Sequence, residues 1–184
     1  PRRLERMVVV ACSRIGSVCV VLENLVDAHN VAAVVRTAEG CGLDAVHVVE
    51  SPNSFRCSRH IAPGANKWIE IIRHSDVHEA VASLRAAGFL IAAADVGDGC
   101  EPFDTIDVDK PIALVMGSEK NGLSVDAKAS SDVRITLPMA GFTGSFNVSV
   151  GAAILLYELS RRRRQHLGHL GDLGDDVRQA RISR

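Results

Sequence analysis

The sequence predicts an α/β fold with a parallel sheet. Short β-branched apolar runs alternate with segments of helical periodicity, which is the pattern of strand–helix–strand units. The runs are apolar at consecutive positions, as expected for strands in a sheet that helices cover on both faces. The chain has 184 residues, of which 47% are apolar and 23% charged. This length and composition suit one globular domain with a core of its own.

The first two elements are expected to be a helix and a strand. Residues 2–12 are predicted to be helical because their apolar side chains share one helical face: Leu4, Met7, Val8 and Ala11. The segment VCVVLE, at 18–23, is short, apolar and β-branched, and it predicts the first strand.

A second helix and strand follow a polar loop. Asn30 can cap a helix that runs to about Glu39, and Gly40 and Gly42 would end it. The segment AVHVVE then predicts a second strand. After it, SPNSFRCSRHIAPGAN reads as a long loop, and long ordered loops are often functional.

The rest of the chain repeats this alternation. Further strands are expected at 67–74, 89–94, 111–116 and 133–137, and helices at 75–88, from Ser124, and over most of 144–164. In parallel sheets ligands bind beyond the carboxyl ends of the strands. The loops after residues 23, 94, 116 and 137 are therefore the expected ligand site.

Charge is divided unevenly along the chain. Residues 1–14 and 161–184 hold eleven arginines and four acidic residues, a net +7, whereas 15–160 carries −8. The arginine-rich ends include the block from Arg161 to Arg164. They are either solvated tails or a grip on a phosphate-rich partner.

Cysteine usage and hydropathy favour a cytoplasmic protein. The cysteines are five, an odd number, with no C-x-x-C pair, which favours reduced thiols and no zinc site. No run of eighteen apolar residues predicts a membrane span, and the N-terminal segment does not read as a signal peptide.

Standard motifs exclude several enzyme classes. A G-x-G-x-x-G dinucleotide motif would need a third glycine where Pro102 stands. The segment GSEKNGLS has the spacing of a P-loop, but Leu123 replaces the phosphate-binding lysine. Arg36 lies on a small, apolar helix segment and needs a partner elsewhere. That partner is either a structural ion pair, with Glu39 or Glu119, or a ligand.

Three segments together resemble the TrmH branch of the SPOUT RNA methyltransferases. They are ENLVDAHNVAAVVRTAEGCGLDAVHVV, IALVMGSEKNGLS and ITLPMAGFTGSFNVSVGAAILLYELSRRR. The intervening GANKWIEIIRHSDVHEAVASLRAAGF also resembles the tRNA-modifying members. The resemblance covers roughly residues 18–165, with the three motifs in order.

This resemblance implies fold and chemistry together. It implies a parallel-sheet fold with a C-terminal deep trefoil knot, a homodimer with shared active sites, and S-adenosyl-L-methionine as cofactor. The implied reaction is methyl transfer to a ribose 2′-hydroxyl of RNA, with the D-loop guanosine of tRNA favoured. Ribosomal RNA is the alternative substrate, and an inactive RNA-binding protein of the same fold is a further alternative.

The resemblance also implies roles for particular residues. Those matching the catalytic positions of its motifs are Asn30, Arg36, Glu119, Ser145 and Asn147. Cofactor contacts, mainly through backbone, are implied near Ala94, Gly117, Leu137 and Phe146, without metal. We further expect Gly141 and Gly144 to let the backbone approach a ligand closely.

The chemistry of Arg36 has two interpretations. A guanidinium has a pKa above about 12 and normally stays protonated, so a role as general base needs a closed, desolvated pocket. The preferred interpretation is that Arg36 stays charged, holds a phosphate and stabilises the developing alkoxide.

The chain ends are assigned to RNA affinity. The division expected is a basic helical extension at 1–17, the methyltransferase domain at 18–165, and a basic, partly ordered tail at 166–184. Arg161, Arg162, Arg163 and Arg164 are the predicted phosphate contacts.

Overall fold

The computed structural model describes residues 2–49 and 68–183 and has the predicted α/β architecture. Its strands and helices are, in chain order, α1 (Arg2–Cys12), β1 (Val18–Glu23), α2 (Ala28–Gly40), β2 (Ala45–Val49), β3 (Glu70–His74), α3 (Val77–Ala86), β4 (Leu90–Ala94), β5 (Glu101–Pro102), β6 (Ile112–Met116), α4 (Val125–Ala129), β7 (Val133–Thr136), α5 (Val148–Leu167) and α6 (Asp175–Ile182). A 3₁₀ turn, Phe103–Thr105, follows β5.

The described strands form one sheet in the order β3-β2-β1-β6-β4-β7-β5. Every neighbouring pair is parallel. All carboxyl ends therefore lie along one edge of the sheet, and loops that are distant in sequence meet there.

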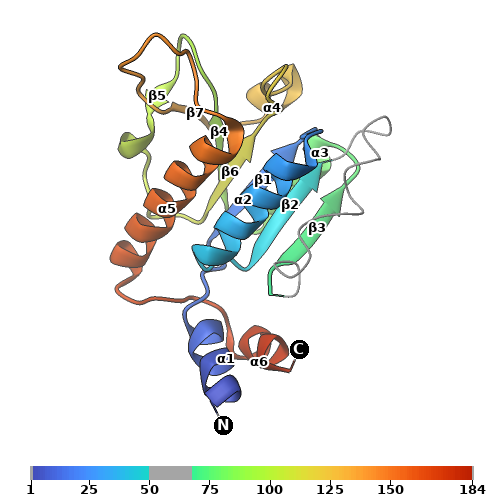
Figure 1. Cartoon of the computed structure of the whole chain (residues 1–184), viewed down its shortest axis with the longest axis vertical. Coiled ribbons are helices and arrows are strands. Elements are labelled where there is room, and N and C mark those ends of the chain that lie inside the picture. The colour runs from blue at the N-terminus through green and yellow to red at the C-terminus, as the bar shows by residue number, and fades with distance from the viewer. Residues whose placement is uncertain (1, 50–67, 184) are drawn as a thin grey trace.

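Two separate apolar clusters fill the faces of this sheet. Val18, Val20 and Leu22 of β1 pack with α2 and α5, whereas Cys19 and Val21 pack with α3 and α4. Figure 1 shows α2 and α5 side by side over one face. Burial on both sides explains why the strands read as continuous apolar runs.

The two ends of the chain meet at the opposite edge, where the strands begin (Figure 1). The Asp172 carboxylate accepts hydrogen bonds from the backbone N–H groups of Gly16 and Ser17. Arg181 of α6 pairs with Asp44 and Glu70, which precede β2 and begin β3. The C-terminal segment is thus bound to the sheet and to the segment that follows α1.

The structure corrects several element boundaries. α2 begins at Ala28, and its N-cap is Asp27, not Asn30, because Asp27 accepts the His29 N–H at 2.8 Å. The short strand β5 lies in a segment predicted as loop, since Glu101–Pro102 has no apolar pattern to mark it. The third strand begins at Glu70 in the structure; residue 67, its predicted start, lies outside the described residues.

Two further expectations concern the chain's periphery. Leu4 and Val8, assigned to the apolar face of the first helix, are exposed, while Ala11 is buried. The loop at 51–66, with Cys57, lies outside the described residues. None of the described helices is long and apolar enough to cross a membrane.

Candidate active site

A cavity of about 570 Å³ opens at the carboxyl edge of the sheet. It lies between the loops that follow β4, β6 and β7, with the start of α5 as a further wall. We call it the carboxyl-edge cavity. The residues expected from sequence that line it are Ala94, Gly117, Glu119, Leu137, Gly144, Ser145, Phe146 and Asn147. Its volume is within the roughly 300–1,000 Å³ of small-molecule sites.

The loop after β6 forms a tight turn that shapes this cavity. Ser118 and Gly122 exchange two backbone hydrogen bonds, of 3.1 and 2.8 Å. A Cβ at Gly117 would overlap the backbone of Gly122, so only glycine fits there. By contrast, a Cβ at Gly141 or Gly144 would meet open space, so the chain's own packing does not require glycine at either position.

Three predicted polar residues meet at the mouth of the cavity. The Asn30 amide donates to Glu119 Oε1 at 2.6 Å, and the Asn147 amide donates to Asn30 Oδ1 at 3.3 Å. They come from the first turn of α2, the loop after β6 and the N-cap of α5. This Asn30–Glu119–Asn147 network joins the three motifs that the sequence singled out.

Local folding explains how the network is held. Asp27 takes the capping role on α2, which leaves the Asn30 side chain to reach Glu119. Asn147 caps α5 by accepting from the N–H and the hydroxyl of Ser149, at 2.9 and 2.6 Å. Asn147 is thus held by its capping contacts, and Asn30 is held by donating to Asp27 at 3.3 Å and to Glu119, so both asparagines are in place before a ligand arrives.

Arg36 is placed differently. It lies six residues after Asn30, so the two side chains point about 120° apart around a helix of 3.6 residues per turn. It does not line the carboxyl-edge cavity, and its side chain is exposed. It makes no hydrogen bond or ion pair with any residue in the described ranges.

The two structural partners that the sequence offered Arg36 are engaged elsewhere. Glu39 pairs with Arg14 at 3.3 Å, and Glu119 accepts from Asn30. An ion pair with a described residue therefore does not explain Arg36, and its guanidinium is available to a ligand or to another chain.

Sequence reasoning missed a charged group in the cavity wall. Asp95 directly follows β4. Its carboxylate forms ion pairs with Lys128, at 3.0 Å, and with Arg134, at 3.3 Å. Burial raises the pKa of Asp95, but the hydrogen bonds from Lys128, the Val96 N–H and Arg134 outweigh this and leave the pKa below its ordinary value. The only sequence signal for Asp95 was its position, since it is the first residue after a strand.

The arginine block is used mostly within the chain. Arg162 donates to the carbonyls of Phe103 and Ile106, and Arg164 donates to those of Leu170, Cys41 and Ser13. Arg163 is 7% exposed and donates to Ser17 and to the carbonyls of Val108 and Asp109. Arg161 alone of the four bonds only to its own helix, at Glu158 and Gln165.

These contacts argue against a phosphate role for part of the block, and the predicted RNA contact of Arg161 to Arg164 stays a prediction. Arg163 is buried, and its Nε and Nη1 groups already donate to three oxygens of the chain, which argues against a phosphate contact. Arg162 and Arg164 likewise use most of their donors on carbonyl groups of the chain. A run of four arginines on a helix distributes its members around the axis, so some of them must face inward.

No group of three or more metal-ligating side chains is found among the described residues. The cavity instead offers two carboxylates, Asp95 and Glu119, and one ammonium group, Lys128. This set, with the backbone of the Gly117 turn, fits a small zwitterionic or cationic molecule.

Comparison with known proteins places this geometry in context. Residues 17–157 match the model of the SpoU rRNA Methylase family. The tRNA (guanosine(18)-2′-O)-methyltransferase of Escherichia coli K12 is 36% identical over 168 residues, which is 91% of this chain and 73% of that one.

Solved structures agree with this match. The A. aeolicus TrmH/SpoU tRNA modifying enzyme superposes with a TM-score of 0.87 at 28% identity, covering 99% of this chain and 93% of that one. The AdoMet-bound rRNA methyltransferase from Sinorhizobium meliloti gives 0.70 at 28% identity, covering 82% of this chain and 58% of that one. Both support the parallel-sheet α/β architecture.

Proposed function

The chain belongs to the SpoU rRNA methylase family, and we propose on that premise that the D-loop guanosine of tRNA is its substrate. The protein is an S-adenosylmethionine-dependent RNA 2′-O-ribose methyltransferase. One observation carries the assignment to tRNA: similarity to a tRNA guanosine methyltransferase extends over 91% of the chain.

The residues of the carboxyl-edge cavity fit the cofactor. Backbone near Ala94, Gly117, Leu137 and Phe146 would hold S-adenosylmethionine, which supplies an activated methyl group on sulfur. Asp95 and Glu119 offer oxygen partners for its cationic groups, and Lys128 offers one for its carboxylate. The Gly117 turn brings backbone to the cavity wall with no side chain between.

The chain's polar residues would then place the ribose. The Asn30–Glu119–Asn147 network and Ser145 stand at the cavity mouth, where amide and hydroxyl groups can orient a 2′-hydroxyl toward the methyl donor. Alignment of the reacting atoms is the protein's main contribution to such a displacement.

Arg36 would act as a charge. Its side chain is exposed to solvent, whereas a role as base needs a closed, desolvated pocket. A positive charge beside the target ribose would hold the adjoining phosphate and stabilise the oxygen as it loses its proton.

We also propose a homodimer, and two observations support it. Arg36 lies outside the cavity of its own chain. Val150, Ile154 and Tyr157 of α5, at helical spacing, expose large apolar side chains that a second copy would cover. Pairing through this face would let Arg36 of one subunit serve the cavity of the other.

The fold proposal includes a C-terminal trefoil knot. The connection between β4 and β6 runs beside the second half of α5, where Arg162 and Arg163 bond to carbonyls of residues 103, 106, 108 and 109. These contacts are those expected if the chain's C-terminal part is threaded through that loop. An experimental structure with the loop wholly on one side of residues 137–167 would contradict the knot.

We also propose the domain division expected from sequence, with the catalytic unit at 18–165 between two basic ends. In support, α1 and α6 lie at the edge where the strands begin (Figure 1). The cytoplasmic location stays a prediction from cysteine usage.

The test is incubation with methyl-labelled S-adenosylmethionine and separate, unmodified tRNA and ribosomal RNA pools, followed by nucleoside mapping. Label in 2′-O-methylguanosine of the tRNA D loop is expected. Label only in ribosomal RNA would show that ribosomal RNA, not tRNA, is the substrate. Cofactor binding without transfer to either pool would indicate an inactive RNA-binding protein of the same fold.

A further inference from the structure

A second cavity, of about 320 Å³, lies at the edge of the sheet where the strands begin. We call it the arginine cavity. One face of α1 supplies most of its wall, and α6, the end of α2 and the residue two positions before β3 complete it. Its lining residues are Arg3, Arg6, Met7, Val10, Ala11, Arg14, Glu39, Trp68 and Arg181.

The charge of this cavity is not balanced within the described chain. Arg14 pairs with Glu39, and Arg181 pairs with Asp44 and Glu70. Arg3 and Arg6 make no hydrogen bond or ion pair with residues 2–49 or 68–183. Both residues line the cavity, so their guanidinium donors are available at its wall.

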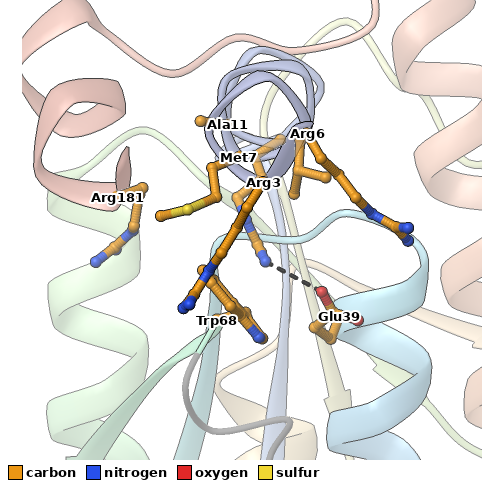
Figure 2. A pocket seen from close by; sticks show the side chains of 9 residues that line it. Arg3, Arg6, Met7, Ala11, Glu39, Trp68 and Arg181 are labelled. Atoms are coloured by element: carbon orange, nitrogen blue, oxygen red, sulfur yellow. Dashed lines mark hydrogen bonds and ion pairs between the residues drawn. The ribbon is translucent and has the colours of Figure 1, made fainter. Parts of the chain in front are cut away.

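Trp68 adds an aromatic surface to these charges. Figure 2 shows Arg3 extending from α1 toward Trp68, with Met7 and Arg181 on the other side of the cavity. Trp68 is partly buried, so its ring is held by the chain while part of it stays accessible. Arginine beside an accessible aromatic ring is the combination that binds a nucleotide, through its phosphate and through stacking on its base.

We infer that the arginine cavity binds one unpaired nucleotide of the RNA substrate, with the phosphate on Arg3 and Arg6 and the base against Trp68. The inference rests on the proposed function for the identity of the RNA. It assigns a second RNA contact, apart from the site of methyl transfer.

The place of the cavity in the fold defines what this contact does. The two cavities lie at opposite edges of the sheet within one subunit, since one is lined by α1 and α6 and the other by the loops after β4, β6 and β7; Figure 1 shows these elements at opposite ends of the strands. A nucleotide in the arginine cavity is thus remote from a ribose at that subunit's methyl-transfer site. The contact selects and holds the RNA body, so its loss should raise the KM for tRNA and leave kcat nearly unchanged.

The chain provides a direct optical probe of this cavity. Trp68 is the only tryptophan in the sequence, so intrinsic tryptophan fluorescence reports on this one position. Titration with unmodified tRNA transcript, in the presence of saturating S-adenosylmethionine, is expected to change this fluorescence saturably. Guanosine 5′-monophosphate should produce the same spectral change at much higher concentration, and inorganic phosphate at matched ionic strength should not.

Matched variants distinguish RNA binding in the arginine cavity from a general effect of positive charge. Arg3→Ser should weaken tRNA binding, whereas Arg2→Ser, the same charge change one residue away and outside the lining, should not. The double variant Arg3→Ser/Arg6→Ser should flatten the log–log salt dependence of tRNA binding by up to about 1.5. Trp68→Phe should retain most of the affinity that Trp68→Leu loses, because phenylalanine still stacks.

The readouts are independent of methyl transfer, so failure here is distinguishable from failure of the proposed function. Unchanged Trp68 fluorescence while tRNA binds by gel shift would overturn the inference. So would equal weakening by Arg2→Ser and Arg3→Ser, or an identical fluorescence change with inorganic phosphate, which would indicate an anion site only. Saturable binding of the mononucleotide without any fluorescence response to tRNA would exclude RNA as the source.

Discussion

Arg36, which we propose to be essential for methyl transfer, makes no hydrogen bond or ion pair with residues 2–49 or 68–183. Its two intramolecular candidates, Glu39 and Glu119, are engaged by Arg14 and Asn30. An exposed charge without a described partner costs little to maintain, so it is free to act on a bound phosphate. Its chemistry is then set by what approaches it and not by the local fold.

Substitution of Arg36 tests this role. Arg36→Ala should lower methyl transfer by about 100-fold or more, the usual effect of removing one group that stabilises developing charge. Cofactor affinity should stay within a few fold, because Arg36 does not line the carboxyl-edge cavity. Isothermal calorimetry and labelled-methyl transfer measure the two quantities. Substantial activity in Arg36→Lys would favour a charge role, and loss of cofactor binding in Arg36→Ala would refute the assignment.

A buried histidine pair makes stability depend on pH. His47 of β2 and His74 of β3 stack with ring centroids 5.2 Å apart, and His47 Nδ1 lies 2.9 Å from His74 Nε2. Burial, and secondarily the neighbouring His74, lower the pKa of His47 to about 4, although Glu70 acts in the opposite direction. The folded chain therefore favours the neutral ring.

The sign of the effect follows from linkage. Below the ordinary histidine pKa of about 6.5 the unfolded chain binds a proton that the folded chain resists, so stability falls between about pH 6.5 and 4. The loss should reach about 3 kcal/mol at most. His47→Gln should make the denaturation midpoint less dependent on pH across this range. The control His78→Gln, at an exposed position on α3, should leave the pH dependence unchanged. A pH profile that His47→Gln leaves unchanged would exclude His47 as the source.

At the scale of elements, the fold followed from sequence more fully than the site did. Strands such as Val18–Glu23 are local apolar runs, and local patterns were enough to find them. The cap of α2 was misassigned to Asn30, because asparagine and aspartate have similar capping preferences and Asp27 lies only three residues earlier.

The site depended on contacts that local patterns do not contain. The hydrogen bond from Asn30 to Glu119 joins residues 89 positions apart, and only the resemblance of three motifs grouped them in advance. The ion pair of Lys128 with Asp95 was missed, because a lysine on a short surface helix has no local signal of an inward partner. The charge of the arginine block predicted that all four side chains would be exposed. Arg163 is buried, because α5 packs this side of its helix against the rest of the chain.

The C-terminal half of α5 is therefore expected to be structural. Arg163→Met should destabilise the protein by at least about 2 kcal/mol, because the carbonyls of Val108 and Asp109 lose a buried donor. Arg161→Met removes the same charge from an exposed position two residues earlier. It should leave the chemical-denaturation midpoint nearly unchanged. Equal, small effects of both variants would return Arg163 to the list of candidate RNA contacts.

At the scale of the whole molecule, the parallel sheet separates two tasks. Its carboxyl edge gathers the loops of the carboxyl-edge cavity, and its opposite edge gathers both chain ends around the arginine cavity. An acidic body, at −8, carries basic ends, at +7, so RNA is attracted to the ends and not to the body. Productive binding then requires the target ribose to reach a cavity whose own chain leaves Arg36 outside.

A dimer resolves this requirement, and complementation between inactive subunits tests it. Arg36→Ala keeps the cofactor cavity intact, whereas Gly117→Ala disrupts it, because a Cβ there overlaps Gly122. Each variant alone should be inactive. If Arg36 serves the cavity of the opposite subunit, a purified heterodimer has one complete site and should recover up to about half of the wild-type activity. Homodimers of each variant, mixed without subunit exchange, are the control. Verified heterodimers without activity would show that each site is built from one chain, and the exposed face of Val150, Ile154 and Tyr157 would then need another explanation.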